Sequence, residues 1–250
     1  MSAWDRILLV AGLALAMALL VHLSKYPMAW AWRTFKISDP DAVYFFTRTA
    51  MTAICCLPLL IFPRLRDVGS MEFPWTWTTL LFLPALALVW SFTGLPSRVL
   101  EFGWLAALGT VWYQFMVALA EEVVFRGYAF CRIPQEHPRL VVLATAAGFA
   151  SSHLVNIAAF PLKAVLWSLP HLFAMGLSFG IVRMVSGSLA WCIVIHTALN
   201  AARPLNSQFL NQMTPYKTAL TLAAAVAVLC LHPIFRSSSP ADDGSQNGAS

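Results

Sequence analysis

The sequence predicts an all-α integral membrane protein, a polytopic bundle of about eight transmembrane helices around a buried polar cavity. Of its 250 residues, 59% are hydrophobic and only 11% are charged, whereas soluble domains carry about 25% charged residues. So few charges cannot cover the surface of a soluble domain of this length, and the apolar surface must therefore face lipid. Tryptophans such as Trp30, Trp75 and Trp104 fall near the ends of apolar runs, where they are typical interfacial anchors.

Apolar runs recur along the chain, and a helix needs about 20 such residues to cross the hydrocarbon core. The runs are Ile7–Leu23, Val43–Phe62, Thr78–Phe92, Leu100–Phe130, Leu140–Ile157, Ala164–Val185, Leu189–Ala202 and Tyr216–Phe235. The fourth is too long for one perpendicular crossing, because roughly 30 helical residues extend about 45 Å. We expect it to tilt or bend, with Gly103 and Gly109 as candidate bend points.

We expect residues 1–236 to form a single transmembrane helical domain, with its motif-bearing core at 100–203. The tail 237–250 contains no apolar residue able to pack, so we expect it to be disordered. The Lys and Arg residues assigned to loops, Arg183 among them, divide almost evenly between the two faces and do not fix the orientation. We expect the first run to be retained as a helix and not cleaved as a signal peptide.

The net charge of +5 would be compatible with nucleic-acid binding in a soluble protein. Here the basic residues are spread among short loops without a dense patch, so we expect the lipid bilayer, and no nucleic acid, as the electrostatic partner. The five cysteines include no CxxC pair, and neither a disulfide framework nor a zinc knuckle is indicated.

The fourth run carries three charged residues, Glu121, Glu122 and Arg126, in the sequence AEEVVFRGYAF. An ionisable side chain within the bilayer costs about 2.5–3.5 kcal/mol on insertion scales, so each one is a functional hypothesis. Residues four apart share a helical face, and Glu122 can therefore pair with Arg126. Glu121 then lies on the neighbouring face without an intrahelical partner, which suits a general base. The alternative is an ion-pair network that only fixes helix packing.

Two later runs also carry polar residues at one-turn spacing. The sequence GFASSHLVN places Phe149 and His153 on one face, and WCIVIHTALNAAR places His196 one turn before Asn200. Either histidine could simply make a hydrogen bond between helices, which is worth about 0.6 kcal/mol on average in membranes. The three polar faces must nevertheless turn inward to avoid lipid, so we expect them to meet in one catalytic cavity. Their combined inventory suits hydrolysis by an activated water, with donors for the developing oxyanion.

The sequences EEVVFR, FASSH and HTALN, in this order, resemble the EExxxR, FxxxH and HxxxN motifs of the CPBP family. That family covers CAAX prenyl endopeptidases and bacterial bacteriocin-processing or Abi-type membrane proteins, regarded as glutamic intramembrane proteases. The resemblance extends over about Val117–Ala202, where Gly176 and Gly180 form a small-xxx-small pattern that permits close helix contact.

The resemblance implies a role for each motif residue. Glu121 and His153 would bind and activate water, Glu122 and Arg126 would form a supporting pair, and His196 and Asn200 would be the oxyanion donors. It also implies a membrane-anchored peptide or protein substrate. We expect a bacterial inner-membrane protein that trims a substrate near the lipid interface.

Three alternatives remain open from the sequence. A zinc-dependent protease could use His153, His196 and a Glu as ligands, although HExxH is absent and Asn200 is a poor zinc ligand. We therefore expect no cofactor and no metal. A non-catalytic scaffold or immunity protein could keep the polar network for folding alone. A proton-coupled transporter usually shows internal repeats, and we find none.

Overall fold

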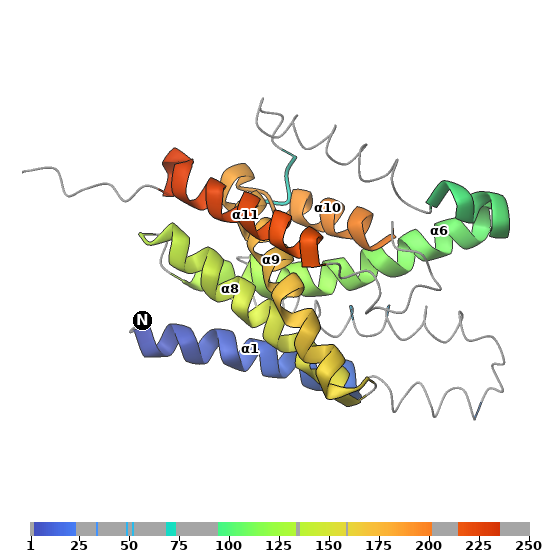
Figure 1. Cartoon of the computed structure of the whole chain (residues 1–250), viewed down its shortest axis with the longest axis horizontal. Coiled ribbons are helices and arrows are strands. Elements are labelled where there is room, and N and C mark those ends of the chain that lie inside the picture. The colour runs from blue at the N-terminus through green and yellow to red at the C-terminus, as the bar shows by residue number, and fades with distance from the viewer. Residues whose placement is uncertain are drawn as a thin grey trace, which may run out of the picture.

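The computed structural model describes residues 3–23, 34, 49, 52, 69–73, 95–133, 136–158, 160–201 and 215–235. Throughout this part of the chain the named elements are helices (Figure 1), namely α1 (Ala3–Leu23), α6 (Leu95–Glu122), the π-helix η2 (Val123–Ala129), α7 (Phe130–Arg132), α8 (Pro138–Ser152), the 3-10 helix η3 (His153–Ala158), α9 (Leu162–Ser186), α10 (Leu189–Ala201), α11 (Pro215–Leu231) and the 3-10 helix η4 (Pro233–Phe235). The expected all-α class is therefore confirmed for these residues.

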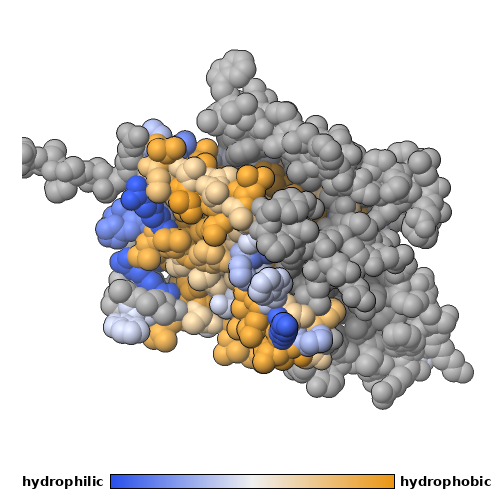
Figure 2. All heavy atoms as spheres, viewed as in Figure 1, coloured by the Kyte–Doolittle hydropathy of each residue, from blue (hydrophilic) through white to orange (hydrophobic). Residues whose placement is uncertain are grey.

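Six of the eight predicted apolar runs correspond to these helices. The runs Val43–Phe62 and Thr78–Phe92 lie largely or wholly outside the described residues, as does the tail 237–250. Within the described part, three helical stretches are long and apolar enough to cross a membrane, Leu108–Arg132, Pro138–Ala158 and Leu162–Ser186. In the coloured part of Figure 2, mostly hydrophobic side chains lie between two groups of hydrophilic ones, as expected for a surface in lipid.

The long fourth run stays α-helical through the two glycines that we named as candidate bend points. Gly103 and Gly109 both lie within α6, which continues as an α-helix to Glu122. The helix type changes directly after Glu122. Residues Val123–Ala129 form a π-helix, and the α-helix resumes at Phe130. π-Helical turns are rare and frequently occur at functional sites. Here the wider turn begins directly after the two glutamates and contains Arg126.

Helix α9 is the central helix of the described part, because it contacts α8, α10 and α11 (Figure 1). Its two predicted small residues lie in the α8 contact. A Cβ atom at Gly176 would be 2.9 Å from Cα of Ala146, and one at Gly180 would be 3.0 Å from Cγ1 of Val142. The predicted close approach through a small-xxx-small pattern is thus confirmed, with α8 as the partner helix.

Replacing Gly176 with Ala is expected to destabilise the fold, because the added methyl group would meet the main chain of Ala146 and would force α8 away from α9. Overpacking of this kind costs about 1–3 kcal/mol, and thermal unfolding in detergent measures it. Gly109→Ala is the matched control, since its added Cβ would meet no atom of another helix within 4 Å in the described part of the chain. Equal melting temperatures for the two variants would contradict the prediction.

Candidate active site

The charged residues of the fourth run form a buried ion pair. Arg126 Nη1 lies 3.2 Å from Glu122 Oε1, and both side chains are 0% exposed. The helical spacing predicts this pair, and it persists although Arg126 lies inside the π-helix. Arg126 also donates from Nη2 to the carbonyl oxygen of Gly176, 2.9 Å away. The guanidinium therefore connects the glutamate to the middle of α9.

Aromatic rings enclose this ion pair. The Arg126 guanidinium carbon lies 4.6 Å from the centre of the Phe149 ring and 5.3 Å from that of Phe179. Both rings are nearly fully buried and belong to α8 and α9. Cation–π contact partly compensates a guanidinium removed from water, and the aromatic surroundings strengthen its attraction to Glu122 by lowering the local dielectric constant.

His196 of α10 lies between the two glutamates. Its Nδ1 is 2.7 Å from Glu122 Oε1, and its Nε2 is 3.6 Å from Glu121 Oε2. The imidazole is 2% exposed and stacks on Phe179, with ring centres 4.5 Å apart. A carboxylate oxygen accepts hydrogen bonds, so the short contact places a proton on Nδ1. The Nε2 atom therefore faces Glu121.

The two glutamates differ in their surroundings. Glu122 is fully buried and bound on one oxygen by Arg126 and His196, whereas the side chain of Glu121 is 13% exposed and has its longer contact with His196 alone. In the described part of the chain, Oε2 of Glu122 and Nε of Arg126 are buried without a hydrogen-bond partner. Unsatisfied buried polar atoms are uncommon and call for an explanation, such as a bound water or a catalytic role.

His153 lies at the transition from α8 to the 3-10 helix η3, and its Nδ1 is 2.9 Å from the carbonyl oxygen of Phe149. Because a carbonyl only accepts, Nδ1 carries the proton and Nε2 keeps its lone pair in the neutral ring. The Phe149 ring contacts both histidines, with centres 4.9 Å from that of His153 and 5.9 Å from that of His196.

The structure thus connects Glu121, Glu122, Arg126 and His196 through direct contacts. His153 joins this group through the Phe149 ring, which it contacts together with His196. Glu121 contacts His196 and, within the described residues, makes no ion pair with His153. Asn200 is half-buried one turn after His196, and its side chain forms no hydrogen bond with any described residue. The expected cavity around these six residues stays a prediction.

Residues 103–202 match the family model described as type II CAAX prenyl endopeptidase, Rce1-like. This segment of the chain is therefore similar to the Rce1-like family. It runs from α6 to α10 and contains all six residues described above. The match, together with the long apolar helices, is consistent with an integral membrane protein that resembles a family of peptidases. No curated protein and no solved structure matches the chain.

The described residues of the matched segment form no ready-made zinc site. A protein zinc site usually has three or four converging side chains, and the described residues contain no group of three or more His, Cys, Asp or Glu arranged to hold a metal. The oxygen of Glu122 nearest to His196 is already bound by Arg126, a cation that would repel a metal ion. We therefore derive no catalytic step through a metal.

Arg183 is a further residue of this site that we did not predict, because we assigned it to a loop. The structure places Arg183 in the last turn of α9, where its side chain is 7% exposed. Its Nε donates to the carbonyl oxygen of Arg126 at 3.1 Å, and its guanidinium carbon lies 5.4 Å from the ring centre of Phe130. Arg183 therefore holds the π-helix from a neighbouring helix. One feature of the sequence could have indicated its burial, since Arg183 lies inside the apolar run Ala164–Val185, near the end of that run.

Replacing Arg183 with Met is expected to loosen the π-helix, because the Arg126 carbonyl would lose a charged donor worth about 1.5–3 kcal/mol. Hydrogen exchange should become faster over Val123–Ala129 and stay unchanged in α11. Arg183→Lys keeps the positive charge without the planar guanidinium and should restore only part of the protection. Unchanged exchange over Val123–Ala129 in Arg183→Met would contradict this role.

Proposed function

We propose that this chain is an intramembrane endopeptidase that hydrolyses a peptide bond of a membrane-associated substrate with a water activated by Glu121 and His153. The observation that carries the proposal is the difference between the two neighbouring glutamates. Glu122 is buried and occupied by Arg126 and His196, whereas Glu121 is part-exposed and retains oxygen atoms that can accept a proton from water. A positioned carboxylate of this kind is a suitable general base.

In the proposed reaction, Glu121 accepts one proton of the water while the water oxygen forms a bond to the scissile carbonyl carbon. The lone pair on Nε2 of His153 orients the same water, since Nδ1 is committed to the Phe149 carbonyl. When the tetrahedral intermediate collapses, the C–N bond breaks and Glu121 returns its proton to the departing amine. No further reactant is required.

The oxyanion is proposed to form near His196 and Asn200. With Nδ1 donating to Glu122, a protonated His196 ring has its Nε2–H available on the side of Glu121. The Asn200 amide lies one turn along α10, and donors aimed at a developing oxyanion contribute about 2.7–4 kcal/mol each in other hydrolases. The Glu122–Arg126 pair would fix the ring orientation of His196.

The proposal is tested by identifying a short membrane protein that accumulates uncut in cells without this chain. Wild-type protein should restore its cleavage and Glu121→Gln should not. Equal restoration by Glu121→Gln would favour the alternative of a non-catalytic scaffold or immunity protein. Loss of activity on chelation, with one zinc regained per chain on reactivation, would favour the zinc-dependent alternative. We propose a bacterial inner membrane as the location, with cleavage near the lipid interface.

A further inference from the structure

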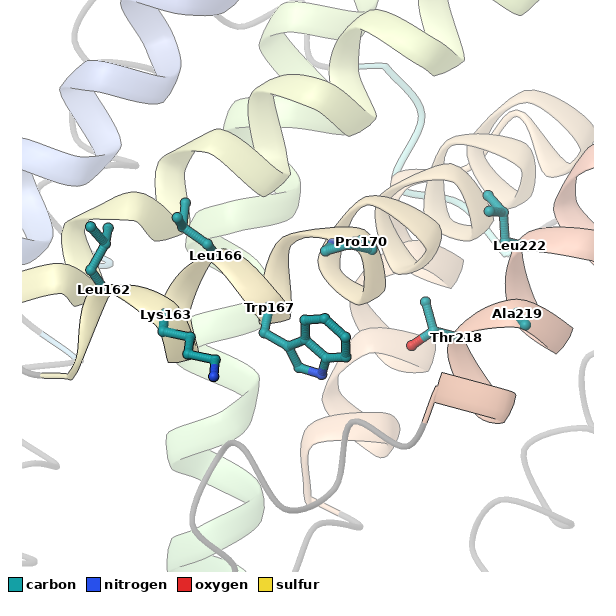
Figure 3. A pocket seen from close by; sticks show the side chains of 8 residues that line it. All are labelled: Leu162, Lys163, Leu166, Trp167, Pro170, Thr218, Ala219 and Leu222. Atoms are coloured by element: carbon teal, nitrogen blue, oxygen red, sulfur yellow. The ribbon is translucent and has the colours of Figure 1, made fainter.

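A groove lies between α9 and α11, away from the charged cluster. Leu162, Leu166, Trp167 and Pro170 line it from α9, and Ala219 and Leu222 line it from α11 (Figure 3). Its cavity volume is about 700 Å³, within the range of roughly 300–1,000 Å³ typical of small-molecule sites. His171 Nδ1 lies 3.2 Å from Thr218 Oγ1 and joins the two helices at the groove.

Most residues that line the groove are apolar. Lys163 is the single charged residue among the described residues that line it. Lys163 is the second residue of α9, and the apolar span Leu162–Ser186 begins at the same turn. Its ammonium group therefore belongs at the membrane boundary. Lys163 is exposed and makes no ion pair with any described residue. Figure 3 shows its ammonium group directed away from the apolar side chains.

Two further features favour a negative group near Lys163. Helix α9 begins after Pro161 without a side chain that caps its first N–H groups, and an uncapped helix start attracts anions. Trp167 lies one turn beyond Lys163, is 67% exposed and carries an indole N–H, a residue typical of the headgroup level. Polar groups of α9 thus gather at one end of a groove whose remaining walls, apart from Thr218 of α11, are apolar.

We propose that this groove binds one anionic phospholipid, with its phosphate at Lys163 and one acyl chain between α9 and α11. The apolar walls suit an acyl chain, because α9 forms one wall of the groove and is long and apolar enough to cross the membrane. The charge of Lys163 distinguishes an anionic headgroup from a neutral one. The groove is separate from the glutamates and from His196, so the lipid would support the fold and not take part in the hydrolysis.

The experiment uses full-length protein released from vesicles made of equal parts phosphatidylglycerol and phosphatidylcholine, with retained lipid counted by native mass spectrometry. Wild type should retain one phosphatidylglycerol in preference to phosphatidylcholine. Lys163→Gln should lower this preference about tenfold, and Lys163→Arg should keep it. Ala219→Phe should abolish retention by filling the groove, whereas Leu220→Phe should not, because Leu220 is 71% exposed and is not a lining residue.

Melting temperatures identify any variant that fails to fold, and Ala219→Leu replaces Ala219→Phe in that case. Equal retention of both lipids by wild type would overturn the proposal, as would undiminished retention in Lys163→Gln. Retention lost in Lys163→Gln but kept in both Ala219 variants would overturn the groove as the site. Lipid retention needs no peptide substrate, so these results are independent of the proposed protease activity.

Discussion

Replacing Glu121 with Gln is expected to lower the rate of substrate cleavage by about 100-fold or more, the size of a general-base contribution, while the melting temperature stays unchanged. Gln keeps the size of the side chain and its capacity to hydrogen bond, but it cannot accept the proton of the attacking water. Because Glu121 is part-exposed and has only a long contact with His196, the fold does not depend on its charge. Cleavage of a membrane-anchored peptide in reconstituted vesicles measures the rate, and thermal unfolding measures the stability.

Glu136→Gln is the matched control for this prediction. It makes the same chemical change at an exposed residue between α7 and α8, and both its cleavage rate and its melting temperature should equal those of wild type. Cleavage by Glu121→Gln at the wild-type rate would remove Glu121 as the base. A parallel loss of activity and of melting temperature in Glu121→Gln would instead indicate that the carboxylate has a structural role.

Replacing Glu122 with Gln is expected to affect stability first. The substitution would leave the Arg126 guanidinium, which is 0% exposed, without the carboxylate that lies 3.2 Å from it. Breaking a buried pair from one side costs about 3–5 kcal/mol, which corresponds to a fall in melting temperature of roughly 10 °C. His196 would also keep a weaker acceptor at Nδ1, so cleavage should fall as well. Thermal unfolding in detergent and the cleavage assay measure the two effects.

The double variant Glu122→Gln with Arg126→Met distinguishes lost charge balance from lost packing. Removing both charges should recover most of the stability, because no unpaired ion remains in the low-dielectric interior. Cleavage should stay low, since His196 would no longer be oriented by an ionised carboxylate. A double variant that is less stable than Glu122→Gln would show that the contact of Arg126 with Gly176 dominates over charge compensation.

The sequence was sufficient to predict the pairing of Glu122 with Arg126 and the burial of His196. The first follows from helical periodicity, since residues four apart share a face. The second follows from the cost of exposing an imidazole to lipid, which turns that face of α10 toward the other helices. The close contact of Gly176 with α8 was predictable for a similar reason, because small residues at this spacing permit close helix approach.

The π-helix was not predictable from the same information, and for Arg183 the sequence offered only its position inside an apolar run. A shift of the helical hydrogen bonds by one residue changes no side chain, so hydropathy and motif spacing do not reveal that Val123–Ala129 forms a wider turn. Arg183 lies in the last turn of α9, where a basic residue usually reaches water or the lipid headgroups. The structure explains its burial, because the side chain donates to the Arg126 carbonyl and lies over the Phe130 ring.

The acceptor that Arg126 uses on α9 is a main-chain carbonyl, and that choice affects what sequence variation can reveal. The oxygen of Gly176 is present whichever amino acid occupies position 176, so no pair of co-varying residues would record this connection between the glutamates and α9. The same glycine sets the distance to α8. A change in helix spacing, from a substitution or from a bilayer of different thickness, would therefore reach the charged cluster without altering any residue within it.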